Sequence, residues 1–144
     1  MYYLDDISEK VMLLFVMITL TFTCFAYDLI SELTSYLGKP SPSEFRRSGV
    51  NTFIHDDKGI SLRVENGLVN VSTALNSFDS IGRANAWVAQ YHDYFDHNDW
   101  ILLSNDSRGT AYHNNEVMAM LVKAWRREDG LTVSTITLAL LPAN

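Results

Sequence analysis

The chain starts with a long apolar stretch. No charged residue occurs from Val11 to Tyr27, and the stretch is bounded by Lys10 and Asp28. At the rise of an α-helix this run covers roughly 25 Å, the short end of what is needed to cross a bilayer. The pattern predicts a cytoplasmic tail over residues 1–10 and a single transmembrane helix over residues 11–30.

Two other interpretations of this stretch stay open. A cleaved secretory signal normally has a basic start, whereas three acidic residues precede the run here: Asp5, Asp6 and Glu9. A buried core helix normally carries one polar face, and this run offers only threonines: Thr19, Thr21 and Thr23. The membrane anchor is therefore preferred, with the C-terminal part in the periplasm and the span in a bacterial inner membrane.

Residues 31–50 are predicted to be a linker. The segment from Gly38 to Ser43 is rich in proline and serine, which should end any helix near Leu37. The remaining residues, 51–144, are enough for one compact domain and too few for two.

The clearest local pattern lies between Ile60 and Leu75. Apolar and polar residues alternate on both sides of Asn66-Gly67, the sequence typical of a type I′ hairpin turn. The turn sets a register in which apolar residues share one face: Val64 with Val69, Leu62 with Val71 and Ile60 with Thr73. An earlier strand is expected over Thr52–His55.

The second half also favours β-structure. Its pattern predicts an extended segment over Arg83–Phe95, a short buried strand at Trp100–Leu103, and a loop over 105–115. Residues Val117–Trp125 fit a helix or a strand equally well, and the β-branched run Thr132–Thr137 should be a strand. If Asp129-Gly130 forms a hairpin turn, it sets Leu121 opposite Leu138 and Ala119 opposite Leu140.

The expected fold class is α+β and mostly antiparallel β: a transmembrane helix followed by a β-rich periplasmic domain, with closure into a barrel as one option. The formal net charge is −6 and no basic run occurs, which argues against direct binding of nucleic acid. Cys24 is the single cysteine, so no internal disulfide can form. No catalytic, cofactor or metal motif is apparent, and no enzyme activity is expected.

The densest polar cluster runs from His92 to Asp99. The carboxylates Asp93 and Asp96 flank two imidazoles, His92 and His97, which should make both imidazoles bind protons more readily. These four residues are the candidate pH-sensing site. A metal site and a solvated turn are the alternatives.

Aromatic residues gather in the same region. Trp87, Tyr91 and Trp100 are candidates either for the core or for a pocket that accepts a small apolar ligand.

In layout the chain resembles the small single-span inner-membrane accessory proteins of the ToxS-type, FidL-like and MyfF- or PsaF-like groups. The local similarity lies in Gly59-Ile60-Ser61-Leu62, in Glu65-Asn66-Gly67-Leu68-Val69-Asn70-Val71 and in the ending Leu141-Pro142-Ala143-Asn144. The resemblance implies a periplasmic domain that binds and stabilises the sensory domain of a membrane-anchored transcriptional regulator, the regulator carrying the DNA-binding domain. It also implies a response to bile-like ligands or to acidity. A stand-alone periplasmic binding or immunity-type protein is the alternative.

Overall fold

The computed structural model describes residue 26, residues 28–126 and residues 130–142. An N-terminal helix, described over residues 28–36, precedes eight strands and a second helix, α2 (Ile81–His97). The strands are β1 (Arg46–Gly49), β2 (Thr52–His55), β3 (Ile60–Glu65), β4 (Leu68–Phe78), β5 (Ile101–Asp106), β6 (Gly109–His113), β7 (Val117–Arg126) and β8 (Leu131–Leu140). The α+β class and the antiparallel sheet are as predicted.

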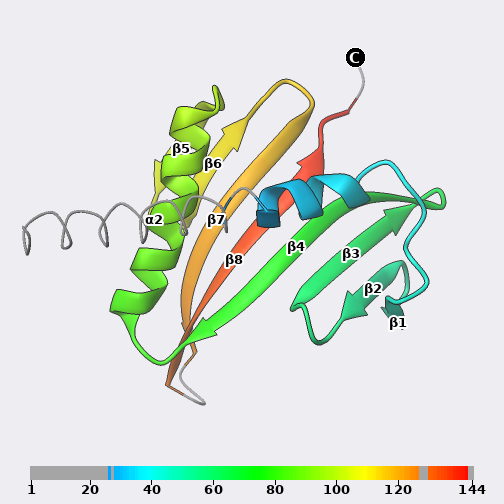
Figure 1. Cartoon of the computed structure of the whole chain (residues 1–144), viewed down its shortest axis with the longest axis horizontal. Helices are drawn as coiled ribbons and strands as arrows, with labels where there is room; N and C mark the ends of the chain where they lie inside the picture. The colour runs from blue at the N-terminus through cyan, green and yellow to red at the C-terminus, as the bar shows by residue number, and fades with distance from the viewer. Residues whose placement is uncertain (1–25, 27, 127–129, 143–144) are drawn as a thin grey trace, which may run out of the picture.

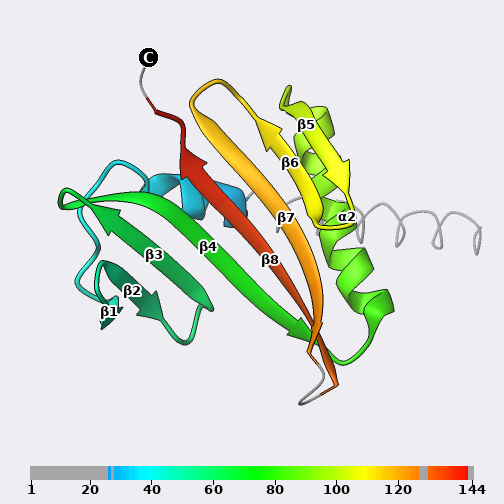
Figure 2. The ribbon, with the colours of Figure 1, turned by 180° about the vertical axis from the view of Figure 1, so that it is seen from behind.

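The eight strands form one sheet with the order β1-β2-β3-β4-β8-β7-β6-β5. Both helices lie on the same face of the sheet in Figure 1, and the other face is uncovered in Figure 2. In the described part of the chain β1 and β5 are the two edges, so the sheet is open and does not close into a barrel.

The fold consists of two similar halves. In each half a helix is followed by a four-stranded antiparallel meander, β1–β4 in the first and β5–β8 in the second. The halves join through the antiparallel pair β4–β8, which runs from Val71 opposite Ala139 to Phe78 opposite Thr132. Each edge of the sheet is therefore the first strand of a half.

The hairpin between β3 and β4 has the predicted turn but a shifted register. Asn66 and Gly67 have φ values of 54° and 80°, and Val64 lies opposite Val69. Beyond this pair a bulge at Asn70 shifts the register by one residue, so that Leu62 faces Ser72 instead of Val71. The predicted pairs Leu62–Val71 and Ile60–Thr73 are wrong for this reason.

The segment predicted to be extended over Arg83–Phe95 is a helix. Ser80 caps α2 by accepting a 3.2 Å hydrogen bond from the backbone N of Arg83. Its buried residues recur at helical spacing: Ala84, Val88, Tyr91 and Phe95. The prediction of an extended segment was wrong because alanines and aromatic residues occur on both faces of the alternating pattern. The helical spacing, in contrast, matches the four buried positions.

Two further expectations for the second half need correction, and one open alternative is resolved. The segment expected to be a buried strand at Trp100–Leu103 contributes to β5, whose residues are all exposed. The expected loop over 105–115 contains β6, because an exposed hairpin turn at Ser107-Arg108 reverses the chain after β5. The ambiguous segment Val117–Trp125 is the strand β7.

Strand β8 contains Thr132–Thr137 as predicted, but its register with β7 differs from the prediction. Leu121 lies opposite Ile136 and Ala119 opposite Leu138, two residues away from the expected partners. Residues 127–129 lie outside the described part of the chain.

The N-terminal helix is part of the hydrophobic core. Its buried side chains follow one face: Ala26, Ile30, Leu33, Tyr36 and Leu37. The helix ends at the predicted position, and Gly38 follows it with a φ of 77°. Buried Phe45 and strand β1 also lie within the segment expected to be a linker over residues 31–50.

The predicted transmembrane segment over residues 11–30 falls mostly outside the described residues. In the part of the chain that the structure describes, no helix has the length and apolar character needed to cross a membrane.

Candidate functional site

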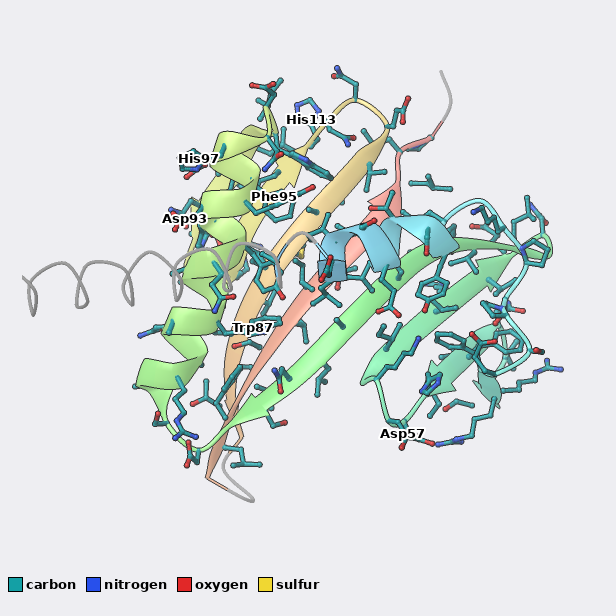
Figure 3. All side chains as sticks on the ribbon, viewed as in Figure 1. Asp57, Trp87, Asp93, Phe95, His97 and His113 are labelled. Atoms are coloured by element: carbon teal, nitrogen blue, oxygen red, sulfur yellow. The ribbon has the colours of Figure 1, made fainter. Side chains whose placement is uncertain are left out.

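The polar residues singled out in the sequence lie on α2, which covers the half of the sheet that ends at β5. Figure 3 shows Trp87 and Phe95 on the side of α2 that faces the sheet, and Asp93 and His97 on the opposite side. The helical spacing of α2 therefore divides the predicted pH-sensing group between two environments.

His92 lies in a partly buried hydrogen-bond network. Its Nδ1 is 2.8 Å from the hydroxyl of Tyr112 on β6, a residue that is only 3% exposed. The carboxylate of Asp96 lies one turn further along α2, close enough to influence this hydroxyl. Burial, followed by the charge of Asp96, raises the pKa of Tyr112. The phenol therefore stays protonated and connects the helix to the sheet.

The pKa of His92 moves in the direction opposite to the prediction. Burial lowers it, since desolvation disfavours the charged imidazolium, and Lys123 on β7 adds to this effect. The nearby carboxylates of Asp96 and Asp93 act against the decrease without reversing it. His92 is therefore held neutral to lower pH than an ordinary histidine.

His97 and Asp93 belong to the solvent-facing side of α2. The Nδ1 of His97 lies 2.7 Å from the backbone oxygen of Asp93, one helical turn earlier, and both side chains are exposed. Of the four predicted residues, His92 bonds to Tyr112 on the sheet, and Asp96 contributes to the raised pKa of that hydroxyl after burial. No cluster of three or more metal-ligating side chains occurs among the residues that the structure describes.

The candidate aromatic residues contribute to the core. Trp87 packs edge-on against Tyr91 with ring centroids 4.7 Å apart, and burial raises the pKa of Tyr91 to about 12. Trp100 packs in the same way on Phe95 at 4.8 Å, and Phe95 stacks on Tyr112. These contacts hold α2 on the sheet.

A pocket of about 470 Å³ opens beside His92. It lies between α2, the β5–β6 hairpin and β7, and none of the three candidate aromatic residues lines it. Its apolar floor includes Val88 and Leu121, and its charged side chains are Lys123, Arg108 and Asp106.

The edge strand β5 presents unusual surface chemistry. Ile101, Leu102 and Leu103 are each 53% exposed, and in the described part of the chain β5 pairs on one side only, with β6. An exposed apolar edge offers unpaired backbone groups and apolar side chains together, a combination that soluble proteins usually avoid.

A groove adjoins this edge on the uncovered face of the sheet. Its volume is about 350 Å³, and Ser104, Ala111 and Met120 line it. These residues lie directly opposite one another on β5, β6 and β7, and Met120 is 41% exposed. The groove lies within reach of a side chain from any segment paired with β5.

Local sequence patterns did not predict this exposed apolar edge. Alternation identifies strands but does not say which strand is the edge, and Ile101-Leu102-Leu103 without polar neighbours is typical of a buried strand. Asp106 and Gly109 flank the two residues of the β5–β6 turn, which was the available signal for a hairpin.

No protein-family model, curated protein or solved structure matches this chain.

Proposed function

We propose that this chain is an accessory membrane protein whose C-terminal domain binds and stabilises the sensory domain of a membrane-anchored transcriptional regulator. The observation that carries the proposal is the exposed apolar edge β5, with Ile101, Leu102 and Leu103 each half-exposed. The uncharged run from Val11 to Tyr27 supports the membrane anchor. The resemblance in layout to accessory proteins of this kind supports the type of partner.

The contrast between the two edges supports a binding role for β5. Strand β1 has only four residues, includes a bulge and carries Arg46, which forms an ion pair with Asp56 at 2.8 Å. Short length, bulges and charge are the features that prevent an edge from pairing with another strand. Strand β5 also contains a bulge, at Leu103, so the contrast lies in length and charge: β5 has six residues, and its first three are apolar and uncharged.

Pairing of the full length of β5 with a second copy of itself would mismatch its residues. Antiparallel pairing of β5 with itself about its centre would set each apolar residue opposite a polar one: Ile101 with Asp106, Leu102 with Asn105 and Leu103 with Ser104. A partner strand with apolar residues opposite Ile101–Leu103 avoids this mismatch. Such strand addition uses backbone hydrogen bonds for affinity and side chains for specificity.

Charge around the edge further defines the partner. Asp96 and Asp99 are exposed just before β5, at the end where its apolar residues lie. A partner strand with basic residues at this end would be attracted to these two carboxylates, whereas an acidic strand would be repelled. The expected partner segment is therefore extended, apolar in its middle and basic at one end.

Site-specific photo-cross-linking tests the proposal. A photoreactive residue is placed at position 103 of the full-length chain, expressed in the cells from which the chain comes, with position 50 as control because Val50 is 82% exposed on the far half of the sheet. The expected product from position 103 is a membrane protein with a DNA-binding domain. A product containing only this chain, or the same products from both positions, would contradict the proposal.

A further inference from the structure

We propose that the pocket beside His92 binds a small organic anion, whose carboxylate pairs with Lys123 and whose apolar body lies against Ala89 on α2. The pocket includes Asn105 and Asp106 of β5 but none of the apolar residues Ile101–Leu103, and the inference does not depend on the proposed partner. It rests on the position, charge and shape of the pocket.

The pocket is built from three elements that come together only in the fold. Helix α2 supplies one wall, the β5–β6 hairpin supplies the other, and β7 supplies the floor. Its volume of about 470 Å³ falls within the range of small-molecule sites. Its polar lining residues are Asn85, His92, Asn105, Asp106, Ser107, Arg108, Thr110 and Lys123.

The charge of the pocket favours an anion. Lys123 donates a hydrogen bond to the amide oxygen of Asn85, and among the described residues no carboxylate lies within ion-pair distance of it. The one carboxylate that lines the pocket, Asp106, is already engaged: it accepts hydrogen bonds from the backbone N of Arg108 at 2.8 Å and from its guanidinium at 3.2 Å. Lys123 is therefore the cation left for a ligand.

The neutral form of His92 fits the same arrangement. The Nδ1 of its ring is held by Tyr112, while the residue also lines the pocket. Lys123 and His92 line the same pocket, and the ammonium group adds to burial in lowering the pKa of His92. Asp93 and Asp96, which act in the opposite sense, are not among the residues that line the pocket.

The size of the pocket sets the second half of the ligand. Val88 is 6% exposed and Leu121 is 2% exposed, so the burial of these two floor side chains is already nearly complete. Ala89 on the α2 wall is exposed and offers an apolar side chain to a ligand. A bare inorganic anion would fill only a small part of the volume of about 470 Å³, whereas an aromatic or aliphatic carboxylate would fill more of it and cover Ala89.

Gly109 fixes the wall that faces α2. A Cβ atom at this position would lie 2.4 Å from the carbonyl oxygen of Leu121 and 3.1 Å from the Cγ2 of Val122. The absence of a side chain lets the hairpin approach β7 closely enough to close one side of the pocket.

The test is an NMR titration of the full-length chain in lipid nanodiscs with benzoate as the probe. Benzamide serves as the uncharged analogue and inorganic phosphate as the anion without an apolar body. We expect saturable shifts at the amides of Gly109, Thr110 and Lys123, with benzoate binding at least about tenfold tighter than either comparison compound, as a charge-assisted contact implies.

Two variants complete the test. Lys123→Gln should weaken benzoate binding about tenfold, whereas Lys58→Gln, which removes a lysine remote from the pocket, should not change it. The absence of saturable shifts, equal binding of benzamide or of phosphate, or unchanged affinity in Lys123→Gln would each overturn the proposal. A failure here would leave the cross-linking result at position 103 unaffected, so the two proposals can fail separately.

Discussion

The hydroxyl of Ser72 on β4 donates a 2.9 Å hydrogen bond to the backbone oxygen of Leu33 in the N-terminal helix. Both residues have an exposed fraction of 0%. The carbonyl of Leu33 lies in the last turn of the helix, where the N–H of Leu37 bonds to Thr34 instead. Ser72 therefore satisfies a helix-end carbonyl that would otherwise be buried without a partner.

This bond predicts the effect of Ser72→Ala. Loss of the hydroxyl leaves the Leu33 carbonyl unsatisfied in the core, so the free energy of unfolding should fall by about 1–3 kcal/mol. Ser77→Ala, at an exposed position of the same strand, is the matched control and should change it by less than about 0.5 kcal/mol. Urea unfolding of the full-length variants measures both. Equal effects of the two substitutions would contradict the assigned role.

His92 predicts a loss of stability on acidification. Because its pKa in the folded chain is lowered, the unfolded chain binds a proton first, and stability falls as the pH drops below the ordinary value of 6.5. His92→Asn keeps a polar group near Tyr112 but cannot titrate, and should flatten the decrease between pH 7 and pH 5. Melting temperatures across this range give the slope, with His97→Asn as comparison. The same slope in wild type and His92→Asn would rule out His92 as the source.

The close contacts around Gly109 predict that adding a side chain there lowers the free energy of unfolding. In Gly109→Ala the new Cβ would collide with the Leu121 carbonyl, and the φ of 149° is strained for alanine. Gly67→Ala is the control, since its φ is 80° but no atom lies within 4 Å of the added Cβ. We expect a loss of about 1–2 kcal/mol at position 67 from backbone strain alone. The loss of unfolding free energy should be larger for Gly109→Ala. A smaller loss than for Gly67→Ala would show that the β5–β6 hairpin can shift to make room for the new Cβ.

The β5 edge predicts a loss of binding without a loss of folding. Leu103→Lys puts a charge on the apolar edge, which should prevent strand pairing with the partner. Because the side chain is 53% exposed, the free energy of unfolding should change by no more than about 0.5 kcal/mol. Val50→Lys introduces the same charge in the other half of the sheet, and this variant should still bind the partner. Co-purification from membranes, quantified for both variants, measures the difference, and retention by Leu103→Lys would count against the edge.

Local patterns predicted much of the first half of the fold. The Asn66-Gly67 turn and the pair Val64–Val69 follow from turn chemistry and alternation, and both are present. The bulge at Asn70 was not predictable from alternation, which continues through the strand without a break. The bulge puts Ser72 opposite Leu62, and the Ser72 hydroxyl bonds to Leu33, 39 positions away in the sequence.

The candidate site was predictable in part. The sequence singled out His92 and Asp96, which lie one turn apart on α2, and the structure bonds His92 to Tyr112. The direction of the His92 pKa shift was not predictable, because it depends on burial in the fold and on the charge of Lys123, which comes from a distant strand. The edge position of β5 likewise depends on the order of all eight strands.

The half-life of the partner regulator in cells is the most direct measurement of the central claim. Once cross-linking from position 103 has identified the regulator, its decay is followed after synthesis is stopped, in cells that lack this chain or express it as wild type, Leu103→Lys or Val50→Lys. We predict that the regulator decays several-fold faster without the chain and with Leu103→Lys, because an unprotected sensory domain unfolds and is degraded more readily. Wild type and Val50→Lys should restore its half-life. A half-life that is the same in all four strains would contradict the claim that this chain stabilises a regulator through β5.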